Sequence, residues 1–202
     1  MPNYYGMVKC IDDNIGRLLA ALRQHGILDN TIVVFTSDHG DCLGFHGQIS
    51  KNNHYELSMR AALAEAAQAK AVGERANGAV AILDEAMVAH GRESVLSTGD
   101  PTAHAVMIAL REAATRLGRR SLAGTTVFCV IEPCPMCVGA LLACDADGVV
   151  FALSDPDEGA CLSAMKLAES KGLQRRLQVV SGILQEEAAE LRPDVVAQAA
   201  RG

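Results

Sequence analysis

Two cysteines and one histidine have the residue types and spacing of a metal site. Cys134 and Cys137 are three residues apart in Pro-Cys-Pro-Met-Cys at a predicted helix start, and His104 lies thirty residues upstream at another. Residues at positions i and i+3 share a helix face, and the free N–H groups and dipole of a first turn favour thiolates. One His and two Cys leave the fourth position of tetrahedral zinc open, as in catalytic rather than structural sites.

The ordinary alternative is that His104 is a core histidine and both thiols are merely buried. A lone Cys-x-x-Cys would leave this alternative at about even odds. Here Asp100, Pro101 and Thr102 predict a helix start, because Asp is a capping residue and Pro favours the first helical position. A strand over 125–131 then leads to the second helix start, and this combination favours the metal site.

The elements that must position these residues lie beyond Leu57. Helices are predicted over 59–70, 103–117, 133–144, 161–170 and 185–191. Strands are predicted over 79–83, 86–89, 125–131 and 148–153, and residues 91–99 form a polar loop. Residues 179–184 are predicted as a last strand or a strand–helix junction. This alternation predicts an α/β fold, a three-layer sandwich with helices on both faces of one sheet.

The first 56 residues have a different pattern. Residues 12–24 predict an amphipathic helix, residues 31–36 a continuous apolar strand, and a Gly-, His- and Asn-rich loop follows to about His54. One helix and one strand cannot enclose a core. We therefore predict an incomplete fragment over 1–56, a domain over 57–192 and a tail over 193–202.

Composition limits the possible functions. The chain has 18 Lys and Arg against 24 Asp and Glu, a net charge of −6, so a nucleic-acid partner would need a local basic patch. Seven cysteines, an odd number in a chain that is not small, favour a reducing compartment with some thiols on a metal. No apolar run reaches the roughly 18 residues of a membrane span, and the N-terminus lacks the pattern of a secretory signal. We expect a cytoplasmic protein with no membrane association.

The metal-site residues resemble the zinc-dependent cytidine and deoxycytidylate deaminases, and within them the bacterial tRNA adenosine deaminases, with the signature His-x-Glu…Pro-Cys-x-x-Cys. The similarity covers about residues 59–192. It is carried by Asp-Pro-Thr-Ala-His-Ala at 100–105, Ala-Leu-Arg-Glu-Ala-Ala at 109–114, Glu-Pro-Cys-Pro-Met-Cys-Val-Gly-Ala at 132–140, and Ser-Asp-Pro…Gly-Ala at 154–160.

This resemblance implies a cytidine-deaminase-like α/β/α sandwich with a mixed five-stranded sheet. It places zinc on His104, Cys134 and Cys137, substrate contacts at Ala105 and Pro133, and two subunits in a dimer. In such enzymes the metal activates a water that attacks a purine or pyrimidine ring carbon, and ammonia leaves.

Two positions depart from the family pattern. The proton-transferring Glu, two residues after the His, is replaced by Val106, which can neither take nor deliver a proton. General acid–base catalysis contributes about 10²–10⁴-fold to rate. The Asn that holds the substrate corresponds to Glu93 by counting back from Asp100, or to Gly91 by matching His90.

Three explanations for Val106 are open. The chain could be a non-catalytic partner, since the eukaryotic heterodimeric tRNA adenosine deaminase has a subunit with Val at this position. Val106 could be an engineered or erroneous change, because Glu and Val codons differ by one base. Another acid could substitute: Glu93 and Asp100 are nearby in sequence, whereas Glu132 occupies the place of a structural Glu in the family.

Residues 1–56 resemble the metal-binding middle of sulfatases. The similarity is carried by Tyr-Tyr-Gly-Met-Val at 4–8, Asp-Asp-Asn-Ile-Gly-Arg-Leu-Leu at 12–19 and Asn-Thr-Ile-Val-Val-Phe-Thr-Ser-Asp-His-Gly-Asp at 30–41. It implies a divalent cation at Asp38 and His39, with His46 and Lys51 near the sulfate. The Cys/Ser-x-Pro-x-Arg nucleophile motif is absent from the sequence. Sulfate ester hydrolysis is therefore a remote alternative, and we interpret residues 1–56 as a fusion or a misassembled reading frame.

These observations predict a zinc-dependent deaminase of tRNA adenosine or a nucleoside, forming inosine from adenosine, with activity weakened or lost through Val106. The alternative is a catalytically inactive, zinc-binding partner subunit of a tRNA adenosine deaminase. The expected partners are a tRNA anticodon loop, or a nucleoside or nucleobase, together with a second copy or an active deaminase chain.

Overall fold

A computed structural model describes residues 2–35, 54–170 and 176–199. The chain divides into two compact units, Met1–Asn52 and Asn53–Gly202. Among the described residues, no helix is both long enough and apolar enough to cross a membrane.

The first unit contains one long helix. Helix α1 (Pro2–Gln24) begins ten residues before the predicted start at residue 12, and a 3₁₀ turn, η1 (Leu28–Asn30), follows it. The strand predicted over 31–36 is wrong for its described part, because residues 31–35 have no regular structure. Ile32 and Phe35 are 90% and 77% exposed. A strand needs a hydrogen-bonded neighbour, and none is present among the described residues of this unit.

The second unit is built on the predicted five-stranded sheet. Its strands are β1 (Gly78–Leu83), β2 (Ala86–Arg92), β3 (Thr125–Ile131), β4 (Gly148–Leu153) and β5 (Gln178–Ser181). They lie in the order β2-β1-β3-β4-β5. Strand β1 is antiparallel to both neighbours, whereas β3, β4 and β5 are parallel, so the sheet is mixed as predicted.

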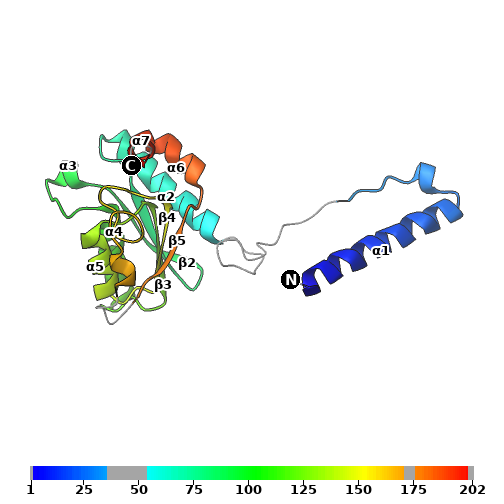
Figure 1. The fold of residues 1–202 in the computed structure, drawn as a ribbon, viewed down its shortest axis with the longest axis horizontal. Coiled ribbons are helices and arrows are strands. Elements are labelled where there is room, and N and C mark those ends of the chain that lie inside the picture. The colour runs from blue at the N-terminus through cyan, green and yellow to red at the C-terminus, as the bar shows by residue number, and fades with distance from the viewer. Residues whose placement is uncertain (1, 36–53, 171–175, 200–202) are drawn as a thin grey trace. The chain divides into compact units, whose positions relative to one another are not determined.

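Helices cover both faces of this sheet (Figure 1). Helices α4 (Ala105–Leu117) and α5 (Pro135–Ala143) cover one face, and α2 (His54–Ala71), α6 (Gln185–Leu191) and α7 (Pro193–Ala199) cover the other. Alternate residues of β3 enter the two cores: Val127 packs on the α4 side, and Phe128 packs on the α2 side. The predicted three-layer α/β/α sandwich is confirmed.

Three local predictions need correction. Strand β2 continues to Arg92 and a short helix, α3 (Val95–Thr98), follows, so residues 91–99 are not simply a loop. Residues 193–199, which were assigned no element, form α7. The helix predicted over 161–170 is reduced to a 3₁₀ turn, η3 (Leu167–Glu169).

The missing helix over 161–170 has a clear physical reason. The backbone N–H groups of Cys161, Leu162 and Ser163 donate to the Glu132 carboxylate rather than leading into a helix. Further along, the N–H of Met165 bonds to the carbonyl of Gly159, six residues back, a wider ring than the four-residue spacing of an α-helix.

Candidate metal centre

Two helix starts position the three candidate metal ligands. His104 is the N-cap residue of α4, and Cys134 is the N-cap residue of α5, so each helix begins one residue after it. The prediction that Asp100 caps this helix, with Pro101 at its first position, is wrong, because α4 begins at Ala105. The Asp100 carboxylate accepts hydrogen bonds from the Thr102 N–H and hydroxyl at 2.8 and 2.7 Å and closes a separate turn before the helix.

Helix α4 reaches this position because β2 carries a glycine beneath it. A Cβ atom on Gly91 would lie 2.4 Å from the carbonyl oxygen of Ala105, so a larger residue would push the helix start away. Of the two positions proposed for the family's substrate Asn, Gly91 therefore packs against the helix, whereas Glu93 lines the cavity.

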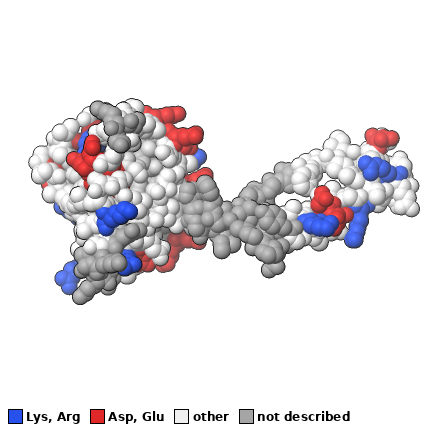
Figure 2. Space-filling model, viewed as in Figure 1, with Lys and Arg blue, Asp and Glu red and all other residues white. Residues whose placement is uncertain are grey.

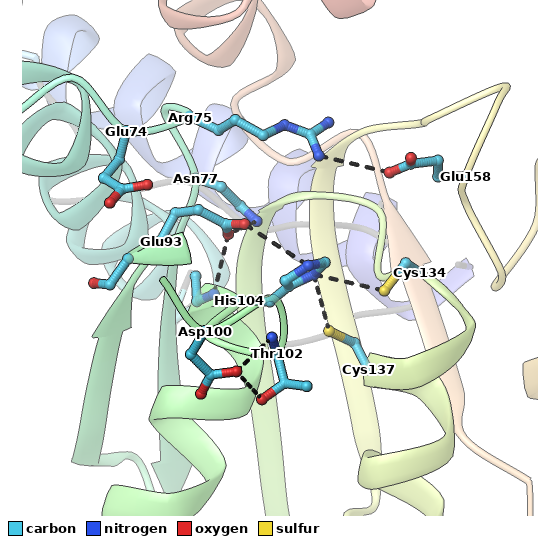
Figure 3. Close-up of polar contacts among 12 residues, drawn as sticks. Glu74, Arg75, Asn77, Glu93, Asp100, Thr102, His104, Cys134, Cys137 and Glu158 are labelled. Atoms are coloured by element: carbon cyan, nitrogen blue, oxygen red, sulfur yellow. Dashed lines mark hydrogen bonds and ion pairs between the residues drawn. The ribbon is translucent and has the colours of Figure 1, made fainter. Parts of the chain in front are cut away.

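The donor atoms of the three candidate ligands converge. The Nδ1 atom of His104 lies 3.6 Å from the Cys134 sulfur and 3.8 Å from the Cys137 sulfur (Figure 3). All three donor atoms lie within 4.8 Å of one another. Zinc bonds of about 2.1 Å to nitrogen and about 2.3 Å to sulfur in a tetrahedral arrangement separate the two donors by roughly 3.6 Å. The donor set and its spacing therefore fit zinc.

Contacts among the two thiols and the imidazole shift their pKa values in different directions. A hydrogen bond with Cys137 lowers the pKa of Cys134 to about 4, against the opposing effect of burial, and contact with His104 adds to the lowering. The same thiol pair raises the pKa of Cys137. Contact with Cys134 raises the pKa of His104. One thiolate is thus already favoured, and a divalent cation would displace the remaining proton.

A small cavity of about 30 Å³ adjoins these ligands. Its lining includes His104, both cysteines, Pro133 and Val106. A cavity of this volume admits one or two waters and not a purine ring. Arg75 and Glu158 also line it and form an ion pair at 3.5 Å, with both side chains about half exposed.

The acidic residues near the cavity differ in whether they line it and in which groups they hydrogen-bond. Glu93 is 2% exposed and lines the cavity. Glu132 also lines it, but its carboxylate accepts the N–H groups of Asp155 and of residues 161–163, which is the structural role expected of it. Asp100 closes the turn described above and is not part of the cavity lining.

Of the other predicted site residues that the structure describes, only one lines the cavity. Pro133 lines the cavity, whereas Ala105 is fully buried and contributes its N–H to Glu93. The sulfatase-type candidates Asp38 and His39 lie outside the described residues. Arg75, Asn77 and Glu158 also line the cavity but were not predicted, because no motif marks them and only the fold brings them there.

Comparison with known proteins agrees with the geometry of the site. The sequence model described as "Cytidine and deoxycytidylate deaminase zinc-binding region" matches residues 52–153, and a Sulfatase model matches residues 1–64. The tRNA-specific adenosine deaminase of Bacillus subtilis (strain 168) is 36% identical over 132 residues, covering 65% of this chain and 82% of that protein. The tRNA-specific adenosine deaminase of Aquifex aeolicus (strain VF5) is 31% identical over 148 residues, covering 70% and 98%.

Solved structures give the same result. A structure from a study of A-to-I editing by tRNA:A34 deaminases at the wobble position of transfer RNA superimposes with a TM-score of 0.65 and 30% identity, covering 67% of this chain and 98% of that one. A mixed sheet between two helical layers, with one His and two Cys at helix starts, defines a zinc-binding deaminase domain. This chain belongs to the cytidine and deoxycytidylate deaminase zinc-binding family.

Proposed function

We propose that this chain is a zinc-dependent hydrolytic deaminase of the tRNA adenosine class whose rate is limited by Val106. The observation that carries the proposal is the convergence of the donor atoms of His104, Cys134 and Cys137 beside a cavity that Val106 also lines. Relatives named tRNA-specific adenosine deaminases support the choice of substrate class.

Each residue of the site has a definable task. His104, Cys134 and Cys137 would hold the metal beside the cavity that they line. When bound, zinc supplies a Lewis acid that activates a water at neutral pH. The cavity of about 30 Å³ is too small for a base, so lining side chains must move before one can enter, and the Arg75–Glu158 ion pair is part of that lining.

Val106 occupies the position at which the reaction needs a proton-transferring group. Its side chain is 1% exposed, lines the cavity, and has no atom that can accept or donate a proton. Hydrolytic loss of an amine requires a proton to reach the leaving nitrogen. Without a carboxylate at position 106, we expect the reaction to run slowly or not at all.

A second function rests on the same residue. A chain that holds zinc but cannot transfer protons could serve as the inactive subunit of a tRNA adenosine deaminase, bound to an active chain. Figure 2 shows basic side chains standing singly or in small groups among acidic and uncharged residues on the visible face of the described chain. Under this alternative, an active subunit would supply part of the tRNA contact.

The test compares Val106→Glu with Val106→Gln on a tRNA anticodon stem-loop, with inosine as the product measured. Gln has the size of Glu but transfers no protons, so it controls for the added volume in a buried position. Zinc content and melting temperature are measured for all three proteins. We expect Val106→Glu to form inosine about 10²-fold faster than the unsubstituted chain, or more. Val106→Gln should form inosine no faster than the unsubstituted chain.

The remaining outcomes separate the hypotheses. Equal activity in the unsubstituted chain and Val106→Glu would mean that Val106 does not limit the rate. Absence of inosine with every zinc-loaded variant would reject tRNA adenosine as the substrate of this chain alone. Inosine formed only when an active deaminase chain is added, and faster than by that chain alone, would support the partner-subunit function.

A further inference from the structure

We propose that Glu93 is a positioning residue of the metal centre, holding the His104 imidazole in the orientation that presents Nδ1 to the metal. The inference rests on the metal-binding part of the proposed function and not on the identity of the substrate. It assigns position 93, where the family resemblance places a substrate-holding Asn, to the support of a metal ligand.

Glu93 is fixed by contacts on one side of its carboxylate. Its Oε2 atom accepts hydrogen bonds from the Ala105 N–H at 3.1 Å and from the Asn77 side-chain amide at 3.3 Å. The Ala105 N–H belongs to the first residue of α4, immediately after His104. Glu93 therefore ties the end of β2 to the start of the helix that follows the metal ligand.

The other carboxylate oxygen is directed at the imidazole. Glu93 Oε1 lies 4.0 Å from His104 Nε2, while Nδ1 on the other side of the ring faces the two sulfurs (Figure 3). With Nδ1 bound to a metal, the ring proton must reside on Nε2. A carboxylate facing that N–H fixes both the tautomer and the ring angle, as in carboxylate–histidine–zinc triads. The proposal requires the 4.0 Å gap to shorten to a hydrogen bond when metal binds.

The buried surroundings would strengthen this hydrogen bond once it forms. Glu93 is 2% exposed and the His104 side chain is 23% exposed, so little water competes for the carboxylate. Asn at position 93 would be one methylene shorter and would present a neutral oxygen. A longer, charged side chain at this position suits the support of a distant ring nitrogen better than contact with a neutral base.

The substitution Glu93→Gln separates positioning from a merely structural role. Both Oε2 partners are N–H donors, so the Gln oxygen must occupy the Oε2 position to keep them. The Gln amide group then faces His104 Nε2, which places one donor against another. The hydrogen bonds from Asn77, just before β1, and from Ala105 of α4 survive, while the support for the imidazole is lost.

The measurement is zinc affinity by competition with a chelating dye, together with the visible spectrum of the cobalt-loaded protein. Glu74→Gln is the matched control, because Glu74 is another buried carboxylate that accepts backbone N–H groups, those of Leu96 and Ser97, and it lies outside the cavity lining. We expect Glu93→Gln to weaken zinc binding by about 10–100-fold and to alter the cobalt spectrum. The zinc affinity of Glu74→Gln should lie within about twofold of that of the unsubstituted chain.

Zinc binding by Glu93→Gln within twofold of the unsubstituted chain would overturn the proposal. Absence of zinc binding by the unsubstituted chain would overturn both this proposal and the metal centre on which the proposed function depends. If Glu93→Gln does not fold, nitrogen-15 NMR of the zinc-loaded unsubstituted chain decides. A His104 Nε2–H that is hydrogen-bonded and slow to exchange is expected, and a freely exchanging or absent Nε2–H would overturn the proposal.

Discussion

Val106 and Glu93 both line the cavity beside His104, and only one of them carries a charge. In the pattern of the family that this sequence resembles, the acid follows the His by two residues and a neutral Asn lies after the second strand. Here the acidic and uncharged positions are exchanged: Val106 replaces the acid, and Glu93 stands where counting places the Asn. The charge at Glu93 is directed at the far side of the imidazole, away from its metal-facing nitrogen.

Cys161 offers a test of burial at the residue scale. Burial, followed by the nearby Glu132 carboxylate, raises the pKa of this thiol from 9.0 to about 12. Between these values the folded chain keeps a proton that the unfolded chain releases, so this thiol's contribution to stability is complete below pH 9 and is lost as pH rises. We expect a loss of about 1 kcal/mol from pH 8 to pH 10 that is absent in Cys161→Ala.

Urea unfolding of both proteins at the two pH values measures this difference. Other groups that titrate in this range contribute equally to both proteins, so only the difference between them reports on Cys161. An equal loss in the two proteins would contradict the assignment.

At the scale of elements, the site depends on how the chain leaves β3 and β4. Strand β3 ends at Ile131, and the next residue, Glu132, turns its carboxylate toward the segment after β4. A Cβ on Gly159 would lie 2.5 Å from the Glu132 carboxyl carbon, so only glycine allows this approach. Glu132 thereby secures the segment over 155–163, which contains Glu158 at the cavity, to the strand that leads into Cys134.

Glu132→Gln tests this anchoring. The carboxylate accepts hydrogen bonds from four backbone N–H groups and from the Ser163 hydroxyl. A Gln amide group would face some of these donors, and we expect the free energy of unfolding to fall by about 3 kcal/mol. Ser163→Ala, which removes a single donor, should cost about 1 kcal/mol. Denaturant unfolding compares the two, and equal losses would show that Glu132 is not the anchor.

At the scale of the whole molecule, the two compact units differ in how they bury apolar side chains. The second unit has a core on each face of its sheet. In the first, Ile11 and Leu18 of α1 are 56% and 58% exposed, and the apolar residues after η1 are exposed as well. Burial of apolar surface is the main source of stability. We therefore expect the stability and metal binding of the chain to reside in Asn53–Gly202.

A chain of residues 53–202 tests that expectation. It should bind zinc within about twofold of the full chain. Its melting temperature should differ by less than about 3 °C, the shift that roughly 1 kcal/mol produces in a domain of this size. Differential scanning calorimetry and the zinc competition assay provide the two values. Loss of zinc binding, or a much lower melting temperature, would show that residues 1–52 contribute to the deaminase domain.

Several elements were determined by the sequence itself. The β-branched strands over 125–131 and 148–153 and the helix over 185–191 were predicted with the bounds that the structure has. Local side-chain preferences and flanking turn residues are sufficient there. The spacing of Cys134 and Cys137 likewise predicted that two donors would point the same way, because a helix start fixes their relation.

Other features were decided only by the tertiary structure. The apolar run over 31–36 reads as a strand, yet its described residues find no partner strand, and residues 161–163 bond to Glu132 instead of forming a helix. Counting residues along the sequence could not decide whether Gly91 or Glu93 occupies the position of the family's substrate-holding Asn. That choice depends on the close approach of α4 to β2. Contacts between residues distant in sequence are set by packing, and for this reason the role of Glu93 beside His104 became visible only in the folded chain.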